Sequence, residues 1–383
     1  MAFQFTLPGR VIFGADALSV GEAVIKELGK KAFIVTGKII TKSGILKILT
    51  DHLQDWSLEY EIFNDITGEP TVEMIEAGVK AYQDGNCDFL IAIGGGSPLD
   101  SAKAIAAMTV LPGSIADYLG KEIKGEFPPT VLIPTTAGTG SEATKFTIIT
   151  DTQKNIKMLL KGDDLLPRVA ILDSTLSLSA PPSITAATGM DALTHAVESY
   201  TSRKGNTLTD GYAISAIRRI FRYLPKAYED GSDRLAREEL LIAAYEAGVC
   251  INNASVTLVH GMSRPIGALF HVPHGISNAM LIVECLSYAL DGCYGRFAEM
   301  AKAIGAAEEE ASEEIAAKAF IKALEDICRV CEIPTLAEYG IKKEEFHALI
   351  PKMAEDALAS GSPGNTIKTV DKEALINIYQ RLW

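Results

Sequence analysis

The first 173 residues alternate between short apolar runs rich in β-branched residues and longer segments in which apolar residues lie three or four apart. Turn residues bound each apolar run, which is typical of buried strands. Helical patterns separate several runs, for example residues 22–29 and 71–85. Alternating strands and helices predict a mostly parallel sheet with helices on both faces. We expect strands at residues 10–14, 31–37, 58–63, 88–96, 130–136, 146–151 and 168–173.

The pattern changes after Asp173, because from Ser183 onward the spacing is helical and no run favours a strand. Pro181 and Pro182 mark the change, and Ser183 is the expected N-cap of the first helix. We therefore predict an α/β domain at residues 1–180 and an all-helical domain at residues 181–383, with the active site in a cleft between them. The clearest helices are expected at residues 184–202, 209–231, 234–254 and 313–331.

Composition narrows the classes of partner. The formal net charge is −13 and no run of Lys and Arg interrupts it, which argues against nucleic-acid and anionic-membrane partners. No signal-peptide pattern opens the sequence and no apolar run is long enough to span a bilayer, so we expect a cytoplasmic protein with reduced thiols. Cys328 and Cys331 form a C-x-x-C pair within an amphipathic helical pattern, which favours packing over redox or zinc chemistry.

A glycine turn follows the apolar run that ends near residue 93. Gly94, Gly95, Gly96 and Ser97 lie between this predicted strand and a helical segment, with Asp100 just beyond. Glycines at such a junction let backbone N–H groups approach a phosphate, and the helix N-terminus adds a favourable dipole. The alternative is a turn that only connects strand to helix. The spacing differs from G-x-G-x-x-G, so the usual dinucleotide fingerprint is absent.

A second loop, rich in small hydroxyl residues, follows the next predicted strand. Thr135, Thr136, Thr139 and Ser141 suit a nucleotide's phosphate and ribose, although such stretches are often plain connections. Because parallel strands end at one edge of a sheet, we expect this loop beside the glycine turn.

The strongest pattern is one carboxylate with three imidazoles. Asp191 and His195 are four residues apart in a predicted helix, so both side chains leave one face. His260 and His274 flank a stretch interrupted by Gly and Pro that could fold back to bring both rings together. Three imidazoles and a carboxylate suit Fe²⁺ or Zn²⁺. Taken singly, each His is better interpreted as a structural residue, but the clustering of these His residues favours a shared metal site.

Four blocks together resemble the iron-containing alcohol dehydrogenase family, and the resemblance runs nearly end to end. That resemblance implies a dinucleotide-binding α/β domain followed by a helical domain, the architecture also found in dehydroquinate synthase. The blocks are GGGSPLDSAKAIA (94–106), PTTAGTGSEATKFTIITD (134–151), SITAATGMDALTHAVESY (183–200) and VHGMSRPIGALFHVPHGISNAML (259–281).

The resemblance also assigns residues. The family's metal ligands fall on Asp191, His195, His260 and His274. Its cofactor loops fall on the glycine turn and the threonine-rich loop, and a Lys near the nicotinamide ribose falls on Lys157. Members of the family commonly form dimers or larger assemblies, so a homo-oligomer is expected.

The chain departs from the family at two positions. Where many members have a His near the nicotinamide, this chain has Arg264, which could bind a cofactor phosphate or a substrate carboxylate instead. His271 could take over proton transfer or simply pack beside the loop. Where many members have an Asp that contacts the adenosine ribose, this chain has Gly37, followed by Lys38 and Lys42. Loss of the carboxylate and gain of positive charge predict a preference for NADP(H) over NAD(H).

These parts predict an oxidoreductase that moves a hydride between NAD(P)(H) and a small alcohol, aldehyde or ketone, with the metal polarising the substrate oxygen. One alternative is a lyase of the dehydroquinate synthase type, which would need basic residues for a polar acid substrate. Another is a nucleotide-binding sensor whose metal is structural, because four protein ligands already complete a tetrahedron.

Overall fold

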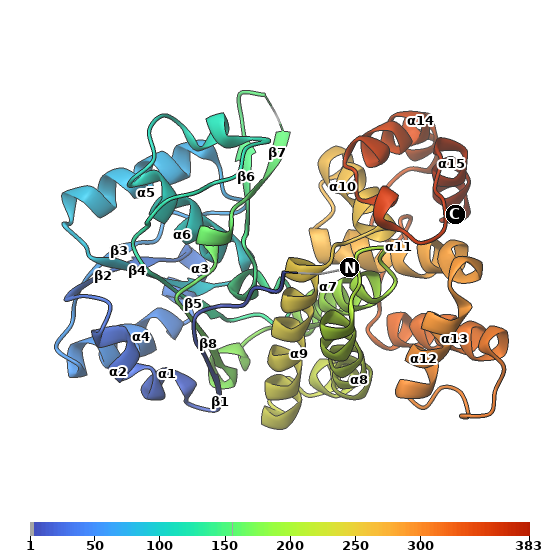
Figure 1. Cartoon of the computed structure of the whole chain (residues 1–383), viewed down its shortest axis with the longest axis horizontal. Coiled ribbons are helices and arrows are strands. Elements are labelled where there is room, and N and C mark those ends of the chain that lie inside the picture. Colours follow the sequence, from blue (N-terminus) through green and yellow to red (C-terminus); the bar gives the residue numbers. More distant parts are fainter. Residues whose placement is uncertain (1–3, 155) are drawn as a thin grey trace. The chain divides into compact units, whose positions relative to one another are not determined.

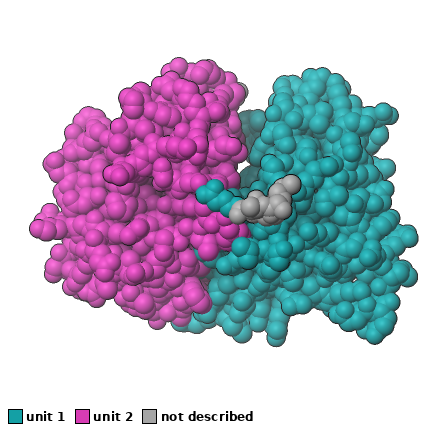
Figure 2. All heavy atoms as spheres, in the orientation of Figure 1, with its two compact units in different colours: residues 1–4, 181–383 teal, residues 5–180 magenta. Residues whose placement is uncertain are grey.

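The chain divides into two units, which Figure 2 shows in magenta and teal. A computed structural model describes residues 4–154 and 156–383. One unit spans Phe5–Ala180 and the other contains Pro181–Trp383. The predicted combination of an α/β unit and a helical unit is confirmed.

The α/β unit is built on a six-stranded parallel sheet with the strand order β1-β8-β5-β4-β2-β3. The central strands are buried on both faces, which is typical of a parallel sheet covered by helices. The strands are β1 (Val11–Gly14), β2 (Lys31–Val35), β3 (Glu59–Phe63), β4 (Phe89–Gly94), β5 (Thr130–Pro134) and β8 (Val169–Asp173).

Helices cover both faces of this sheet (Figure 1). One apolar core lies under α5 and α6, where Ile75 and Leu99 pack. The other lies under α1, α2 and α4, where Leu18, Ile25 and Leu49 pack. The helices are α1 (Ala17–Val20), α2 (Glu22–Lys26), α3 (Lys38–Lys42), α4 (Ile45–Asp55), α5 (Val72–Asp84) and α6 (Gly96–Met108).

A separate antiparallel hairpin, β6 (Phe146–Asp151) and β7 (Ile156–Lys161), corrects the sequence analysis. We placed residues 146–151 among the strands of the main sheet and predicted no strand between them and the strand expected at 168–173. The second strand is difficult to recognise because Lys157, Leu159 and Lys161 are all exposed, so only Met158 and Leu160 supply the buried side of the alternation.

Apart from an isolated bridge between Ser202 and Thr366, the regular secondary structure in the described residues of the second unit is helical, and its first helix begins earlier than predicted. Pro181 is the N-cap and Pro182 the first helical residue, so the prediction of Ser183 as N-cap is wrong. Pro suits this position because its missing N–H would be unpaired there in any residue. The helices are α7 (Pro182–Tyr200), α8 (Thr207–Glu229), α9 (Arg234–Asn253), α10 (Leu258–Phe270), α11 (His274–Ala289), α12 (Tyr294–Ala303), α13 (Glu313–Val330), α14 (Lys343–Ala359) and α15 (Lys372–Arg381).

Two further observations concern partners and chemistry. Among the residues that the structure describes, every helix is too short or too polar to cross a bilayer. Cys328 and Cys331 are free thiols on and just after α13. Burial raises the pKa of each thiol to about 12, which favours the packing interpretation because a reactive or metal-binding thiol needs the thiolate.

Candidate functional site

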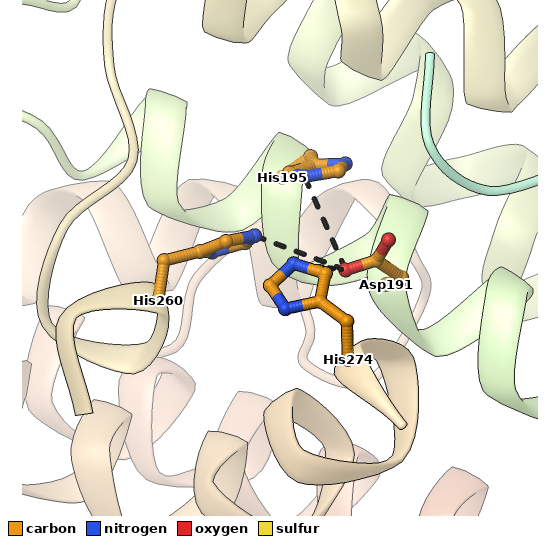
Figure 3. Close-up of side chains that lie close together, drawn as sticks. All are labelled: Asp191, His195, His260 and His274. Atoms are coloured by element: carbon orange, nitrogen blue, oxygen red, sulfur yellow. Dashed lines mark ion pairs between the residues drawn. The ribbon is translucent and has the colours of Figure 1, made fainter. Parts of the chain in front are cut away.

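Four side chains from three helices of the helical unit meet in one cluster. Asp191 and His195 project from α7, His260 from α10 and His274 from the start of α11 (Figure 3). One ligand atom from each residue lies within 4.8 Å of the others. Nε2 of His195, His260 and His274 lies 4.0, 3.8 and 3.6 Å from Oδ1 of Asp191. The structure therefore brings together the four side chains that the sequence pattern singled out.

Local sequence explains how the third helix comes so near. His274 is the first residue of α11, and Gly275 follows it. A Cβ atom at Gly275 would lie 2.3 Å from the carbonyl oxygen of Ala187 on α7. Only glycine therefore allows the start of α11 to pack against the backbone of α7 beside Asp191.

A buried carboxylate fixes the orientation of His260. Glu198, one turn beyond His195 on α7, lies 2.5 Å from Nδ1 of His260 through Oε2. Its Oε1 accepts hydrogen bonds from the Thr257 hydroxyl at 2.8 Å and the Val259 amide at 2.6 Å. With the Nδ1 proton directed at this carboxylate, Nε2 of His260 presents its lone pair to the cluster.

Electrostatics favour the ligand forms of these side chains. Burial, with the neighbouring imidazoles, lowers the pKa of His260 well below its usual value, so the ring is neutral at neutral pH. Burial alone would raise the pKa of Asp191, but the three imidazoles and Asn278 hold it below its usual value. The Nδ2 group of Asn278 donates to Oδ1 of Asp191 at 2.7 Å. A neutral imidazole and an ionised carboxylate are the donors that a divalent metal ion requires.

The cluster is buried except on one side. Asp191, His195 and His260 are buried, whereas the side chain of His274 is 44% exposed. Nδ1 of His195 is buried without a hydrogen-bond partner among the described residues. Three nitrogen donors and one oxygen donor at this spacing fit Fe²⁺ or Zn²⁺ in chemistry and number.

The predicted cofactor loops lie at one edge of the α/β sheet. β4 ends at Gly94 opposite Pro134 of β5, and the Thr135 amide donates to the Gly94 carbonyl at 2.9 Å. Gly95 is the N-cap of α6, so the glycine turn leads directly into a helix N-terminus. Gly96 packs closely on this loop, because a Cβ atom there would lie 2.8 Å from Cγ2 of Thr139. Gly95, Gly96, Ser97, Thr136 and Thr139 are all partly exposed.

A buried lysine, Lys103, connects the helix that follows the glycine turn to the threonine-rich loop. The fully buried Lys103 of α6 donates to the carbonyl oxygens of Ser141 at 2.9 Å and Thr144 at 3.3 Å. Asp100 accepts from the Ser141 hydroxyl and, at 2.9 Å, from the Ile148 amide. Asp100 and Ser141 thus bind each other and hold the loops in place.

Gly37 and Lys38 lie at the same sheet edge, just after β2. Gly37 is the N-cap of the short helix α3, and a Cβ atom there would lie 2.8 Å from the Ile66 carbonyl oxygen. Lys38 is exposed and lies 3.8 Å from a carboxylate oxygen of Asp65. Lys157, on β7, forms an exposed ion pair with Glu69.

The two predicted catalytic residues lie on the helix that carries His260. Arg264 is one turn further along α10 and is partly buried. His271 caps the C-terminal end of α10 with a left-handed backbone at φ 55° and is exposed. The remaining two His residues are structural: His52 packs on Trp56 and His347 on Trp383.

Sequence reasoning missed three residues of these sites, namely Glu198, Asn278 and Lys103. Helical spacing could have found the first two. Glu198 follows Asp191 by seven residues and His195 by three, and Asn278 follows His274 by four, so each shares a helix face with a predicted ligand. No pattern marks Lys103, because a lysine within SAKAIAAM would ordinarily be exposed.

Comparison with known proteins identifies the same family in both units. Residues 8–174 match the family described as iron-containing alcohol dehydrogenase, and residues 185–383 match the C-terminal domain of the same family. NAD-dependent methanol dehydrogenase of Bacillus methanolicus is 36% identical over 94% of this chain and 95% of its own length. Lactaldehyde reductase of Escherichia coli is 34% identical over 100% of both chains. A crystal structure of 1,3-propanediol oxidoreductase superposes with a TM-score of 0.96, at 34% identity over 100% of both chains.

Proposed function

The chain belongs to the iron-containing alcohol dehydrogenase family, and from that premise we propose which of its residues perform the chemistry. The protein is a metal-dependent oxidoreductase that transfers a hydride between a nicotinamide cofactor and a small alcohol or aldehyde. We assign the divalent ion to Asp191, His195, His260 and His274. The observation that carries this assignment is the convergence of all four ligand atoms within 4.8 Å.

The proposed mechanism gives each group of residues a distinct task. When bound, the ion polarises the substrate oxygen and the nicotinamide gives or accepts the hydride. Glu198 holds the proton of His260 on Nδ1 through a hydrogen bond, so the lone pair of Nε2 stays available to bind the ion throughout turnover. Asn278 holds Oδ1 of Asp191 in one orientation. The burial of three of the four side chains limits the access of water to the reacting groups.

We assign the nucleotide to the loops at the carboxyl ends of β2, β4 and β5. The partly exposed backbone of Gly95, Gly96 and Ser97 at the start of α6 is suited to the phosphates. Gly94 provides the turn, with φ at 150°. The proposed contacts of the threonine-rich loop come from Thr136 and Thr139, with Thr135 buried behind them. Asp100 and Ser141 contribute by fixing the loop, and Lys157 is assigned to the nicotinamide ribose.

We further propose that NADP(H) is preferred over NAD(H). The end of β2 offers Gly37 instead of a carboxylate, and the exposed Lys38 and Lys42 follow in α3. The related methanol dehydrogenase is named as an NAD-dependent enzyme, so this preference would distinguish this chain from that relative. Comparing kcat/KM for the two cofactors tests it, and a clear advantage for NAD(H) would contradict it.

The structure suggests a better variant for this test than an Asp at Gly37, because a side chain there would collide with the Ile66 carbonyl group. Lys38→Ala should reduce kcat/KM with NADP(H) several-fold more than with NAD(H). The matched control is Lys80→Ala on α5, because Lys80 is similarly exposed and is distant in sequence from Lys38.

His271 is proposed to pass protons between the site and solvent. Its exposure at the end of α10, three residues before His274, supports this role. Arg264 cannot serve as an acid or base, because a guanidinium stays protonated at the pH of turnover even though burial lowers the pKa of Arg264. His271→Asn should therefore change the pH–rate profile, and an unaltered profile and rate would exclude His271 from proton transfer.

Loading and removing the metal tests the function as a whole. Purified protein treated with a chelator should lose NAD(P)H-dependent reduction of small aldehydes and regain it with Fe²⁺ or Zn²⁺. We propose Fe²⁺ as the native ion, which anaerobic purification followed by elemental analysis would identify. Restored metal content without any turnover would instead support the sensor alternative, whereas turnover of a cyclic phosphate-bearing acid without net change of cofactor would support the lyase.

We also propose a cytoplasmic homo-oligomer. β1 is an edge strand of the sheet and leaves Phe13 64% exposed, and an open edge of this kind is suited to pairing with a second copy of the chain. Light scattering during size-exclusion chromatography should give the mass of a dimer or a larger assembly.

A further inference from the structure

Arg264 is a cation placed beside the metal-binding cluster. It follows His260 by one turn of α10, so the two side chains leave the same face of the helix. Burial lowers the pKa of Arg264, and the carboxylate of Glu198, which also orients His260, offsets part of that effect.

The donors of this guanidinium are unused within the protein. Across residues 4–154 and 156–383, Arg264 has no hydrogen-bond acceptor and no carboxylate within 4.0 Å. The nearby Glu198 does not supply one, because its two oxygens already accept from Thr257, Val259 and His260. If Arg264 served only as the ion-pair partner of Glu198, the guanidinium and the carboxylate would be in contact, and they are not.

A cation in this position opposes the function of its neighbours. It repels a divalent ion at the cluster and cannot carry protons. Five N–H donors in a planar fork match a carboxylate or another oxyanion better than any other ligand. The phosphates of the cofactor have their own donors in the backbone of the other unit, at the start of α6. The anion that Arg264 suits is therefore one carried by the molecule that the metal centre binds.

We propose that Arg264 binds an acid group on the substrate, so that the enzyme acts on small aldehydes or alcohols that carry a carboxylate or sulfonate. Residues one helical turn apart have Cβ atoms about 6 Å apart, which corresponds to an acid group a few carbons from the reacting oxygen. This inference rests on the proposed function, since it adds a specificity group to the same metal centre.

The test compares matched aldehydes with the metal-loaded enzyme. Succinic semialdehyde and butanal form one pair, and sulfoacetaldehyde and propanal form another. The parent enzyme should favour the anionic member of a pair in kcat/KM. In Arg264→Gln this ratio should fall by about 10- to 100-fold, the effect of losing a charge-assisted bidentate contact. Arg264→Lys should retain part of the preference. Arg218→Gln, which changes an exposed arginine on α8, is the control and should leave the ratio unchanged.

A binding measurement supplements the rates. Calorimetry with 4-hydroxybutanoate should give a dissociation constant that rises in Arg264→Gln, whereas the Kd for the cofactor should not change. An equal preference for charged and neutral aldehydes in the parent, or an unchanged ratio in both variants, would overturn the inference. A rise in the cofactor Kd with an unchanged aldehyde ratio would overturn it in favour of a cofactor phosphate. Failure of the loaded enzyme to reduce any aldehyde would instead contradict the proposed function.

Discussion

The two units build their candidate ligand sites in opposite ways. In the helical unit, Asp191 and three imidazoles offer side-chain atoms that helix spacing brings together. In the α/β unit, the glycine turn offers backbone N–H groups and requires the absence of side chains, as at Gly96. A site made of side chains depends on particular functional groups, whereas a site made of backbone depends on close packing. Single substitutions should therefore affect the two sites in different ways.

A buried carboxylate next to each site shows the same contrast. Glu198 in the helical unit accepts three hydrogen bonds and orients His260, a proposed metal ligand. Glu142 in the threonine-rich loop is equally buried, yet neither of its oxygens meets a donor among the described residues. Burial raises the pKa of Glu142 to about 7, although Lys103 partly opposes this. Glu198 therefore supports the neighbouring site, whereas the burial of Glu142 without a hydrogen-bond donor lowers the stability of the α/β unit.

The largest effect should follow removal of a ligand. His260→Ala should lose most bound metal and reduce kcat/KM on the order of 1,000-fold, because polarisation of the substrate oxygen contributes several kcal/mol. Elemental analysis and steady-state rates measure both. His52→Ala is the control, since His52 only packs on Trp56. A His260→Ala enzyme with full metal content and normal turnover would remove this residue from the centre.

Glu142 should make stability depend on pH. Its usual pKa of 4.5 applies in the unfolded chain and about 7 in the fold. Between these values the folded state holds a proton that the unfolded state has released, so stability falls as the pH rises from about 4.5 to 7. The fall attributable to this residue is on the order of 3 kcal/mol, and above pH 7 it stays constant.

Chemical denaturation of the cofactor-free protein at several pH values measures this effect. Glu142→Gln cannot ionise, so its free energy of unfolding should fall less over the same range. Glu126→Gln, at an exposed position in the same unit, is the matched control. If the parent and Glu142→Gln lose stability in parallel, the carboxyl group of Glu142 is not neutral in the fold.

The sequence predicted elements well and their ends poorly, and the errors fall at the functional loops. The strands expected at 31–37, 88–96 and 130–136 end instead at Val35, Gly94 and Pro134. The excess residues include Gly37, Gly95, Gly96, Thr135 and Thr136, which are the proposed cofactor residues. In the sequence, glycine and threonine look like a continuation of the apolar strand pattern. In the structure they lie outside the strands, because the loops and α6 require other backbone conformations.

The side-chain site was more accessible to sequence reasoning than its surroundings. Asp191 and His195 could be paired from helical spacing alone, whereas the approach of α11 depends on Gly275, which has no distinctive sequence context. The contacts of Lys103 with the proposed cofactor loops could not be predicted, because they depend on carbonyl groups from a segment about 40 residues later. Long-range backbone contacts of this kind leave no periodic signal.

Glu198 should affect metal affinity without supplying a ligand. Glu198→Gln keeps the shape of the side chain but removes the charge that accepts the Nδ1 proton of His260. Loss of such a carboxylate typically weakens metal binding by about 10- to 100-fold. Competition with a chromophoric chelator measures the Kd directly, independent of activity. Glu299→Gln is the control. It removes another carboxylate of the helical unit, one that accepts a hydrogen bond from Tyr200, and it should leave the Kd for the metal unchanged.

The smallest effect should come from one methyl group in the glycine turn. In Gly96→Ala the new Cβ atom would lie 2.8 Å from Cγ2 of Thr139, so the two loops must move apart by a few tenths of an ångström. Because the proposed phosphate contacts come from this backbone, the KM for the cofactor should rise on the order of tenfold while metal affinity stays the same. Thr139→Ser removes the colliding Cγ2 atom, so the double variant should recover much of the loss. Gly211→Ala, where a Cβ atom meets nothing within 4 Å, is the control for replacing a glycine as such. If Thr139→Ser gives no recovery, the glycine is needed for backbone freedom or for space for the cofactor itself, and close packing between the loops is not what fixes the site.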